Sequence, residues 1–447
     1  MYLFFVRHFN DIDHLTPVAW KLQKDSYQVA VFCMNLRYDI QQDYRLQFLK
    51  DQGVAVDYLY DAFYEKRDPV HKCLNWLIRA SYNAQRKLTH DYQGPAGALP
   101  KLLGQLAGLA GTMFYKIARI IYYGQRWARS VLERTNAQAV CFDYIMPSLY
   151  IVDAFLKAAR QMSIPILALP HGIQLYTNEI TKPKSTETRR FAKFNRFDYI
   201  IATNKLRKDF LVKAGVADDK ISVLGSARYC RAWLEQNNEI VPAAAAKFSG
   251  SSEKLKVVLM PSKPQCRLDI KRMFASGRLI AELNGIEAVI KPHTRTHTID
   301  QFGNYPLPDV SHVLTADLCG WADVLLVVGS SVMTEALMRG KPVLYLKYLH
   351  DNTTLFEELG ACWIIHNEFE LKNALVSLQA QKTDVPYSEK SVAAFLAEVV
   401  YGGDRNRDVL DAYEQFIVDC ALSKKSIAQQ RDTLHDLSAY QKNGYPE

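Results

Sequence analysis

The stretch from Leu325 to Lys347 constrains the fold more than any other part of the chain. It reads LLVVGSSVMTEALMRGKPVLYLK: an apolar run, a Gly-Ser-Ser break, a segment with helical spacing, and a second apolar run after Gly-Lys-Pro. Short continuous apolar runs are typical of parallel strands buried on both faces. A glycine followed closely by a proline suits a helix end. The stretch therefore predicts a strand, a tight turn, a helix and a second strand.

The Gly329-Ser330-Ser331 turn places two hydroxyl groups at the N-terminus of the predicted helix. Unpaired backbone N–H groups and the positive end of the helix dipole meet there, and together they attract anions. The turn is therefore a candidate phosphate site, and Glu335, one turn further on, is a candidate partner for a ribose hydroxyl. An ordinary unit in which a serine only caps the helix, with Glu335 on a plain helix surface, is the alternative.

The same alternation of short apolar strands and helices runs through most of the chain. In the first half, strands are predicted over residues 2–6, 28–32, 139–142, 165–169, 199–203 and 221–224. In the second half, they are predicted over residues 256–260, 288–291, 325–328 and 343–346. We expect an α/β fold with two Rossmann-like domains facing across a cleft. The predicted domains are residues 1–236 and 255–447, joined by a Pro-, Ala- and Ser-rich linker over 237–254, and the tail over 392–422 is predicted to be helical.

Composition narrows the class of partner. The 447 residues carry a formal net charge of +8, which suits acidic ligands or an anionic surface. The chain contains no zinc finger, RNP motif or basic heptads, so nucleic acid is not an expected partner. The eight cysteines are scattered singly, which favours reduced buried thiols over disulfides or zinc. The chain begins with the strand-like YLFFV and lacks a charged leader, so we expect it in the cytoplasm.

The segment over residues 92–132 is basic and free of acidic residues. Its cations, Lys101, Lys116, Arg119, Arg126 and Arg129, alternate with large apolar side chains. The apolar part is too short to span a bilayer, which requires ~20 residues. A basic amphipathic segment can instead lie among lipid headgroups, which predicts peripheral contact with the inner face of the cytoplasmic membrane. A helix packed on its own domain, with the cations in water, is the alternative.

Two polar segments follow strands of the predicted first domain and are candidates for proton transfer. Residues 7–14 are predicted to form a polar loop between the first strand and a helix over 15–23, and they include Asp13 and His14. His171 lies between a proline and a glycine at the end of another strand. Strand ends in such a domain face the ligand cleft, so these three side chains are the candidate catalytic bases. An Asp or Asn that only caps the following helix is the alternative for residues 7–14.

Three strand ends of the predicted second domain converge on one edge and predict a phosphate site. The side chains concerned are Ser262, Lys263, His293, Arg295, Ser330 and Ser331. Cations and hydroxyls around a helix N-terminus hold phosphate without carboxylates for Mg²⁺, so neither a metal nor another cofactor is expected. The chain has no GxxxxGK[ST] and no GxGxxG, which argues against P-loop NTPases and dinucleotide dehydrogenases.

These motifs resemble those of GT-B glycosyltransferases. The PHG run at His171, the run KPHTRTH at His293 and GSSVMTEALMRGKPVLYL at Ser330-Ser331 are most similar to capsule-type bacterial enzymes. These are the Kdo transferases and the CDP-glycerol glycerophosphotransferases. The match at His293 departs from the family pattern, because Pro292 precedes the histidine and Thr294 follows it.

The resemblance implies a glycosyltransferase with a nucleotide-sugar donor, for which CMP-Kdo is the favoured type. Its acceptor would be a hydroxyl of a membrane-associated surface polysaccharide or glycolipid. Charge on the departing phosphate would be stabilised by Lys263, His293, Arg295 and the helix N-terminus.

Three other functions are compatible with the same sequence. A CDP-glycerol-type glycerophosphotransferase shares the motifs. A nucleotide-sugar 2-epimerase shares the fold, needs no acceptor, and requires several carboxylates in the cleft. A polysaccharide-binding protein without activity would need no phosphate site at all.

Overall fold

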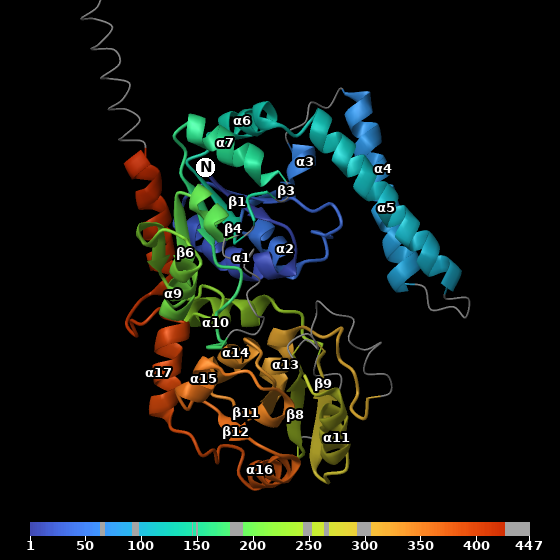
Figure 1. Cartoon of the computed structure of the whole chain (residues 1–447), viewed down its shortest axis with the longest axis vertical. Coiled ribbons are helices and arrows are strands. Elements are labelled where there is room, and N and C mark those ends of the chain that lie inside the picture. Colours follow the sequence, from blue (N-terminus) through green and yellow to red (C-terminus); the bar gives the residue numbers. More distant parts are fainter. Residues whose placement is uncertain are drawn as a thin grey trace, which may run out of the picture.

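The computed structural model describes residues 1–62, 68–91, 98–144, 146–148, 151–178, 191–244, 253–262, 268–292 and 305–424. Within these residues the chain forms two β-sheets, one above the other in Figure 1. The first has the order β3-β2-β1-β4-β5-β6-β7, with strands at Ala55–Tyr58, Val29–Cys33, Tyr2–Val6, Ala139–Asp143, Ile166–Leu169, Tyr199–Ala202 and Ile221–Val223. The second has the order β12-β11-β10-β8-β9, at Trp363–Ile365, Val343–Leu346, Val324–Val327, Leu255–Met260 and Ile286–Ile290.

Every paired strand in both sheets is parallel to its neighbours. Helices join the strands, as parallel pairing requires. In the first half they are α1 Phe9–Lys24, α2 Tyr44–Asp51, α3 Leu59–Ala62, α4 Pro69–Arg86, α5 Ala98–Ile121, α6 Gln125–Arg134, α7 Val152–Gln161, α9 Lys205–Lys213 and α10 Arg231–Ile240. In the second they are α11 Ile270–Ala281, α13 Thr315–Trp321, α14 Val332–Met338, α15 Leu355–Glu358, α16 Glu368–Ala380 and α17 Glu389–Val399. The predicted α/β fold with two Rossmann-like domains is confirmed.

Alternation along the strands builds a core on each face of each sheet. In β1, Tyr2, Phe4 and Val6 belong to one hydrophobic cluster, whereas Leu3 and Phe5 belong to the cluster on the opposite face. The central strands are apolar throughout because helices cover both of their faces. The stretch from Leu325 to Lys347 forms the predicted elements: β10, α14 and β11 are a buried strand, a helix and a buried strand.

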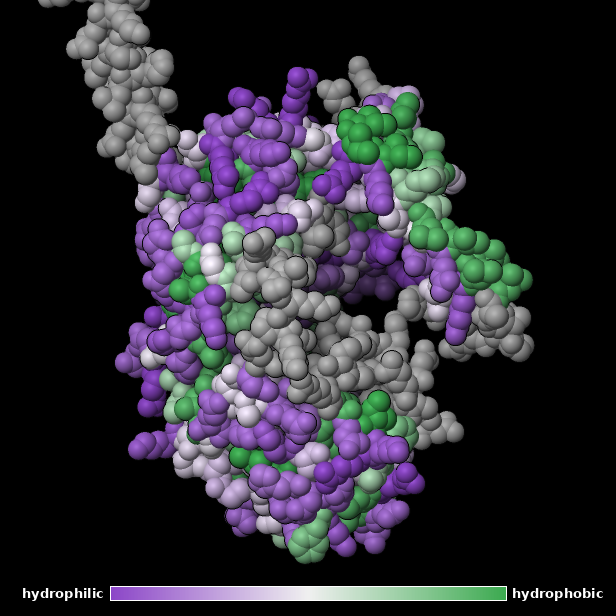
Figure 2. All heavy atoms as spheres, in the orientation of Figure 1, coloured by the Kyte–Doolittle hydropathy of each residue, from purple (hydrophilic) through white to green (hydrophobic). Residues whose placement is uncertain are grey.

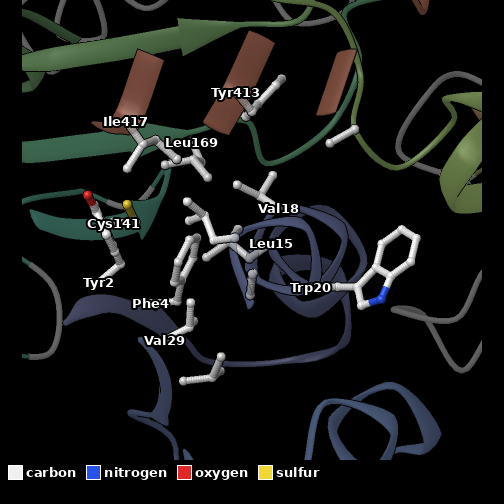
Figure 3. Packing of buried hydrophobic residues seen from close by; sticks show 14 of the residues in the cluster. Tyr2, Phe4, Leu15, Val18, Trp20, Val29, Cys141, Leu169, Tyr413 and Ile417 are labelled. Atoms are coloured by element: carbon white, nitrogen blue, oxygen red, sulfur yellow. The ribbon is translucent and has the colours of Figure 1, made fainter. Parts of the chain in front are cut away.

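The C-terminal part of the described chain returns to the first domain. A helix over residues 409–424 follows α17 after a turn at Gly402-Gly403. Its Tyr413 and Ile417 lie in the same cluster as Leu169 and Val18, as Figure 3 shows. The tail is therefore helical as predicted, but it forms two helices, and the second packs on the first sheet. The domain boundaries at 236 and 254 stay a prediction, and residues 245–252 of the predicted linker lie outside the described residues.

The expectation of a polar loop over residues 7–14 is wrong. Helix α1 begins at Phe9, and Asp11, Asp13 and His14 are buried within it. Arg7, just before the helix, pairs with Asp11, and Arg45 of α2 pairs with Asp13, so both aspartates are buried with a charged partner.

The basic segment over residues 92–132 forms two different structures. Helix α6 packs on its own domain through Ala128, Val131 and Leu132, which was the alternative to membrane contact. Helix α5 pairs instead with α4, and Figure 1 shows this α4–α5 hairpin standing out from one side of the first domain. No described helix is long and apolar enough to cross a membrane.

Candidate functional site

The carboxyl ends of three neighbouring strands bring four side chains together. Arg7 follows β1, Asp143 ends β4, His171 follows β5, and Asp11 lies in the first turn of α1. His171 Nδ1 lies 2.7 Å from Asp143 Oδ2 and 3.2 Å from Asp11 Oδ1. Arg7 Nε donates to Asp11 Oδ2 at 2.9 Å, and Arg7 Nη2 donates to Asp143. Both carboxylates are fully buried, so the arginine and the histidine are what make their charge tolerable.

Burial and charge act in opposite directions on the pKa of each group in this cluster. Burial alone would lower the pKa of His171, but its hydrogen bonds to Asp11 and Asp143 outweigh burial and raise it. Burial, together with the neighbouring charge of Asp11, raises the pKa of Asp143 to about 6. Burial disfavours the charged form of Asp11, yet the contacts of Asp11 with His171 and Arg7 hold its pKa well below the usual value. The cluster therefore keeps an imidazole of raised basicity on a buried carboxylate.

His171 also borders a cavity of about 170 Å³. Tyr144, Gln174 and Arg207 line the same cavity. When Nδ1 donates to Asp143, the other imidazole nitrogen, Nε2, is the one that can accept a proton. This arrangement is that of a general base whose tautomer and orientation are set by a carboxylate.

Asp143→Asn should move the acid limb of the rate profile to lower pH. A raised pKa means that His171 becomes a neutral base only at a higher pH than an ordinary histidine. Removing the Asp143 charge lowers that pKa, so activity should begin to rise at lower pH, with a maximum at least tenfold below wild type. The measurement is kcat/KM between pH 5 and 9. An acid limb that stays in place would contradict the assignment of His171 as the base.

Asp13, a predicted catalytic base, lies in a separate network. Arg45 Nη1 pairs with Asp13 Oδ1, and Arg228 Nη1 lies 3.0 Å from Asp13 Oδ2. Asp43 pairs with Arg45 at 2.6 Å from the other side. Two arginines therefore already neutralise the Asp13 carboxylate, which favours a role in holding Arg228 over one in accepting protons. The third predicted base, His14, is buried on α1 three residues beyond Asp11.

The second sheet presents hydroxyls at its own carboxyl edge. Met260 pairs with Val327 across β8 and β10, so Ser262 and Ser330 follow adjacent strand ends. Ser262 Oγ is buried and has no hydrogen-bond partner among the described residues, although buried hydroxyls are normally paired. Ser331 precedes the first residue of α14, and Tyr229 Oη donates to its Oγ at 3.4 Å. The predicted Lys263, His293 and Arg295 lie outside the described residues.

Glu335, predicted to meet a ribose hydroxyl, is buried and pairs with Arg339 at 2.8 Å. It also lines a cavity of about 30 Å³ between the two domains, together with Asp13 and Arg228. The structure thus brings Asp13 and Glu335 to one place, in a space that fits only water.

The segment after His171 connects the two candidate sites. Tyr176 Oη donates to the carbonyl oxygen of Gly329 at 2.7 Å, directly before Ser330. The backbone N–H of Thr177 donates to Thr353 O at 3.0 Å, and that of Leu355 donates to Leu175 O at 2.8 Å. Five residues beyond His171, the chain is therefore held to the turn of the second domain.

One group of described residues could offer three ligand atoms to a metal ion. These are His8, Asp11 and His171, with ligand atoms within 4.8 Å of one another. Arg7 donates to both oxygens of Asp11, and His171 Nδ1 contacts Asp143, so these atoms already have protein partners. The expectation that no metal takes part stays a prediction.

Sequence reasoning placed His171 and the segment over residues 7–14, which contains Arg7 and Asp11, at the cleft, but it missed Asp143 and Tyr176. Asp143 directly ends a predicted strand, so the rule that parallel strand ends share one edge was the available signal. Asp11 and Arg7 appeared as loop residues, and nothing in the local pattern around Tyr176 indicates a contact with the second domain.

No family model matches the chain. No curated protein sequence matches it either.

Solved structures with a similar fold do exist. They include the UDP-GlcNAc 2-epimerase of Methanocaldococcus jannaschii, with 13% identity and a TM-score of 0.53 over 93% of this chain and 98% of that one. The Neisseria meningitidis UDP-GlcNAc 2-epimerase, bound to UDP-GlcNAc, has 16% identity and a TM-score of 0.50 over 95% of this chain and 100% of that one. The UDP-N-acetylglucosamine 2-epimerase of Rickettsia bellii has 12% identity and a TM-score of 0.50 over 94% of this chain and 96% of that one. The chain has the GT-B-like fold of two facing α/β domains.

Proposed function

We propose that this chain is a nucleotide-sugar-dependent enzyme in which His171, oriented by Asp143, removes a proton from the sugar or from its acceptor. The observation that carries the proposal is the 2.7 Å contact between His171 Nδ1 and a fully buried Asp143, beside a cavity at the carboxyl edge of the sheet. Perturbed, paired titratable groups in such a place are typical of catalytic bases.

The nucleotide phosphates would bind at the edge of the second sheet. The unpaired hydroxyl of Ser262 and those of Ser330 and Ser331 are donors at neighbouring strand ends. Lys263, His293 and Arg295, expected from the sequence at the same edge, would supply positive charge. Such donors stabilise negative charge that develops on a departing phosphate. The hydrogen bond between Tyr176 and Gly329 would fix the position of this edge relative to His171.

A nucleotide-sugar 2-epimerase is the first candidate reaction. The similar solved structures with TM-scores of 0.50 to 0.53 are UDP-GlcNAc 2-epimerases, one of them bound to UDP-GlcNAc. Inverting carbon 2 of a nucleotide sugar requires a base that removes its proton while the nucleotide diphosphate leaves carbon 1, and a group that returns a proton on the other face as the diphosphate adds back. Such an epimerase requires several carboxylates, and the presence of Asp11 and Asp143 beside His171 supports this candidate.

Glycosyl transfer is the second candidate. It is favoured by the exposed apolar and basic α4–α5 hairpin, since an epimerase acting on a small soluble substrate needs no such surface. The motif resemblance supports it as well. The donor would be a CMP-sugar such as CMP-Kdo, or CDP-glycerol in the glycerophosphotransferase variant. His171 would take the proton of an acceptor hydroxyl on a surface polysaccharide or glycolipid.

Proton exchange in D₂O separates the two reactions. UDP-GlcNAc, CMP-Kdo and CDP-glycerol are each incubated with the protein, and the carbon-2 proton of UDP-GlcNAc and the phosphorus signals of all three are followed by NMR. Deuterium at carbon 2 of UDP-GlcNAc without any acceptor would establish epimerisation. Donor consumption without exchange, such as slow hydrolysis of CMP-Kdo, would establish transfer chemistry. Neither exchange nor consumption with any of the three would contradict the proposal.

A further inference from the structure

The α4–α5 hairpin exposes large apolar side chains along most of its length. On α5 they are Leu99, Leu102, Leu103, Leu106, Leu109, Met113, Ile117, Ile120 and Ile121, and on α4 they are Val70 and Trp76. Leu109 and Trp76 are each 66% exposed, and Ile120 is 83% exposed. Figure 2 shows hydrophobic side chains over this part of the molecule, at the upper right. A contiguous apolar surface of this extent marks a binding site.

The nine exposed apolar residues of α5 share one face of that helix. They recur at intervals of three or four positions, and at 3.6 residues per turn they fall within an arc of about 120°. The opposite face packs on α4 through Gly104, Gly108 and Gly111. A Cβ at Gly108 would lie 2.5 Å from the side chain of Gln85, and one at Gly111 would lie 2.7 Å from Tyr82. Glycines therefore make the contact between the helices, and the leucines remain on the outside.

Only one end of the hairpin is anchored in the body of the domain. Ile78 and Ala118 belong to the hydrophobic cluster that β1 and β4 build, and Tyr115 packs against that cluster. The apolar side chains from Leu99 to Leu109 belong to no hydrophobic cluster of the described residues. The exposed face is therefore not needed to hold the domain together.

The charge around this face selects its partner. Residues 69–121 contain one acidic residue, Asp91, and seven cations: Lys72, Arg79, Arg86, Lys87, Lys101, Lys116 and Arg119. Lys101, Lys116 and Arg119 are exposed on α5 itself, beside the apolar face. A second copy of the hairpin would bring cations against cations. An anionic lipid surface offers both the apolar interior and the opposite charge.

We propose that the α4–α5 hairpin docks this chain on an anionic lipid bilayer, with its leucine face among the acyl chains and its cations at the lipid phosphates. In this arrangement the hairpin lies along the interface. The docking surface excludes α6, where Arg129 pairs with Glu133 at 2.8 Å and the apolar side chains belong to the core. The proposal is independent of the reaction that the chain catalyses.

Co-sedimentation with vesicles tests this proposal. The full chain is mixed with vesicles of phosphatidylcholine alone or with about one third phosphatidylglycerol, at low and high salt. We expect binding to the anionic vesicles and at least tenfold weaker binding after Leu102→Gln, Leu106→Gln and Leu109→Gln are combined. Combining Lys101→Gln, Lys116→Gln and Arg119→Gln should weaken binding to the anionic vesicles but not to the phosphatidylcholine vesicles. It should also make binding to the anionic vesicles less sensitive to salt.

The matched control replaces three exposed apolar residues elsewhere, with Phe369→Gln and Val376→Gln on α16 and Leu422→Gln in the last described helix. This variant should bind like wild type, and all variants should keep their melting temperature because the replaced side chains are exposed. Wild type that stays in the supernatant with anionic vesicles at low salt would overturn the proposal. So would a wild-type dimer that the three leucine replacements convert to a monomer, since the face would then belong to a second copy.

Discussion

His171→Ala is expected to lower kcat by about 10²–10⁴-fold and to leave nucleotide affinity nearly unchanged. The imidazole is 30% exposed and contributes little to the core, so the variant should fold normally. Asp143 keeps Arg7 as a partner after the histidine is removed, so no buried charge is left alone. The expected loss is therefore specific to the chemical step, and single-turnover kinetics with saturating nucleotide sugar measures it.

His8→Ala is the matched control for this variant. His8 is similarly exposed, its ring lies 5.6 Å from that of His171, and its Nδ1 lies 3.2 Å from Asp11 Oδ1. Asp143 orients the imidazole of His171, whereas His8 pairs with Asp11, so removing His8 should cost less than tenfold in kcat. Equal losses in the two variants would mean that the cluster acts as a general electrostatic site, without one base.

Gly329→Ala is expected to reduce both stability and activity, because the added methyl group disrupts the contact between Tyr176 and Gly329 that joins the two domains. Gly329 has φ +67°, and a Cβ there would lie 2.4 Å from Tyr176 Oη. The left-handed backbone costs a residue with a side chain ~1–2 kcal/mol, and overpacking adds ~1–3 kcal/mol. Displacing Tyr176 also shifts the turn that carries Ser330 and the segment that carries His171. We expect kcat/KM to fall at least tenfold and the melting temperature to fall by several degrees.

Gly340→Ala separates the two costs of this change. Gly340 has φ +66°, almost the same as Gly329, but no atom lies within 4 Å of a Cβ built there. This control should show the backbone cost and no loss of activity. If both variants lose stability equally and neither loses activity, the contact between Tyr176 and Gly329 does not couple the domains.

The fold could be read from the sequence because its signals are local. The unit over residues 325–347 combines buried strands, a glycine with positive φ and a proline that prevents the helix from continuing, and each of these acts within a few residues. The start of α1 could not be read in this way. Asp13 looks like a loop residue until its distant partners Arg45 and Arg228 are known, and Asp11 until its contact with His171 is known.

The candidate site was only partly predictable, for the same physical reason. His171 stands out locally, since a histidine between proline and glycine at a strand end has no place in a core. Asp143 looks like the polar end of a strand, and only the strand order β1-β4-β5 places it beside His171. The sequence indicated a basic amphipathic segment over residues 92–132, but a pattern of leucines and glycines does not say which of them meets the neighbouring helix.

Thermal unfolding with nucleotides tests the central claim most directly. Wild type and His171→Ala are melted with saturating UDP, CMP, CDP or GDP, and with the corresponding sugars. A ligand at about 100 times its Kd adds ~2.7 kcal/mol to the stability of the folded state. Our account predicts that at least one nucleotide raises the melting temperature of both proteins equally, and that only wild type converts the matching nucleotide sugar. If no nucleotide raises the melting temperature, or if His171→Ala converts the sugar as fast as wild type, the account is wrong.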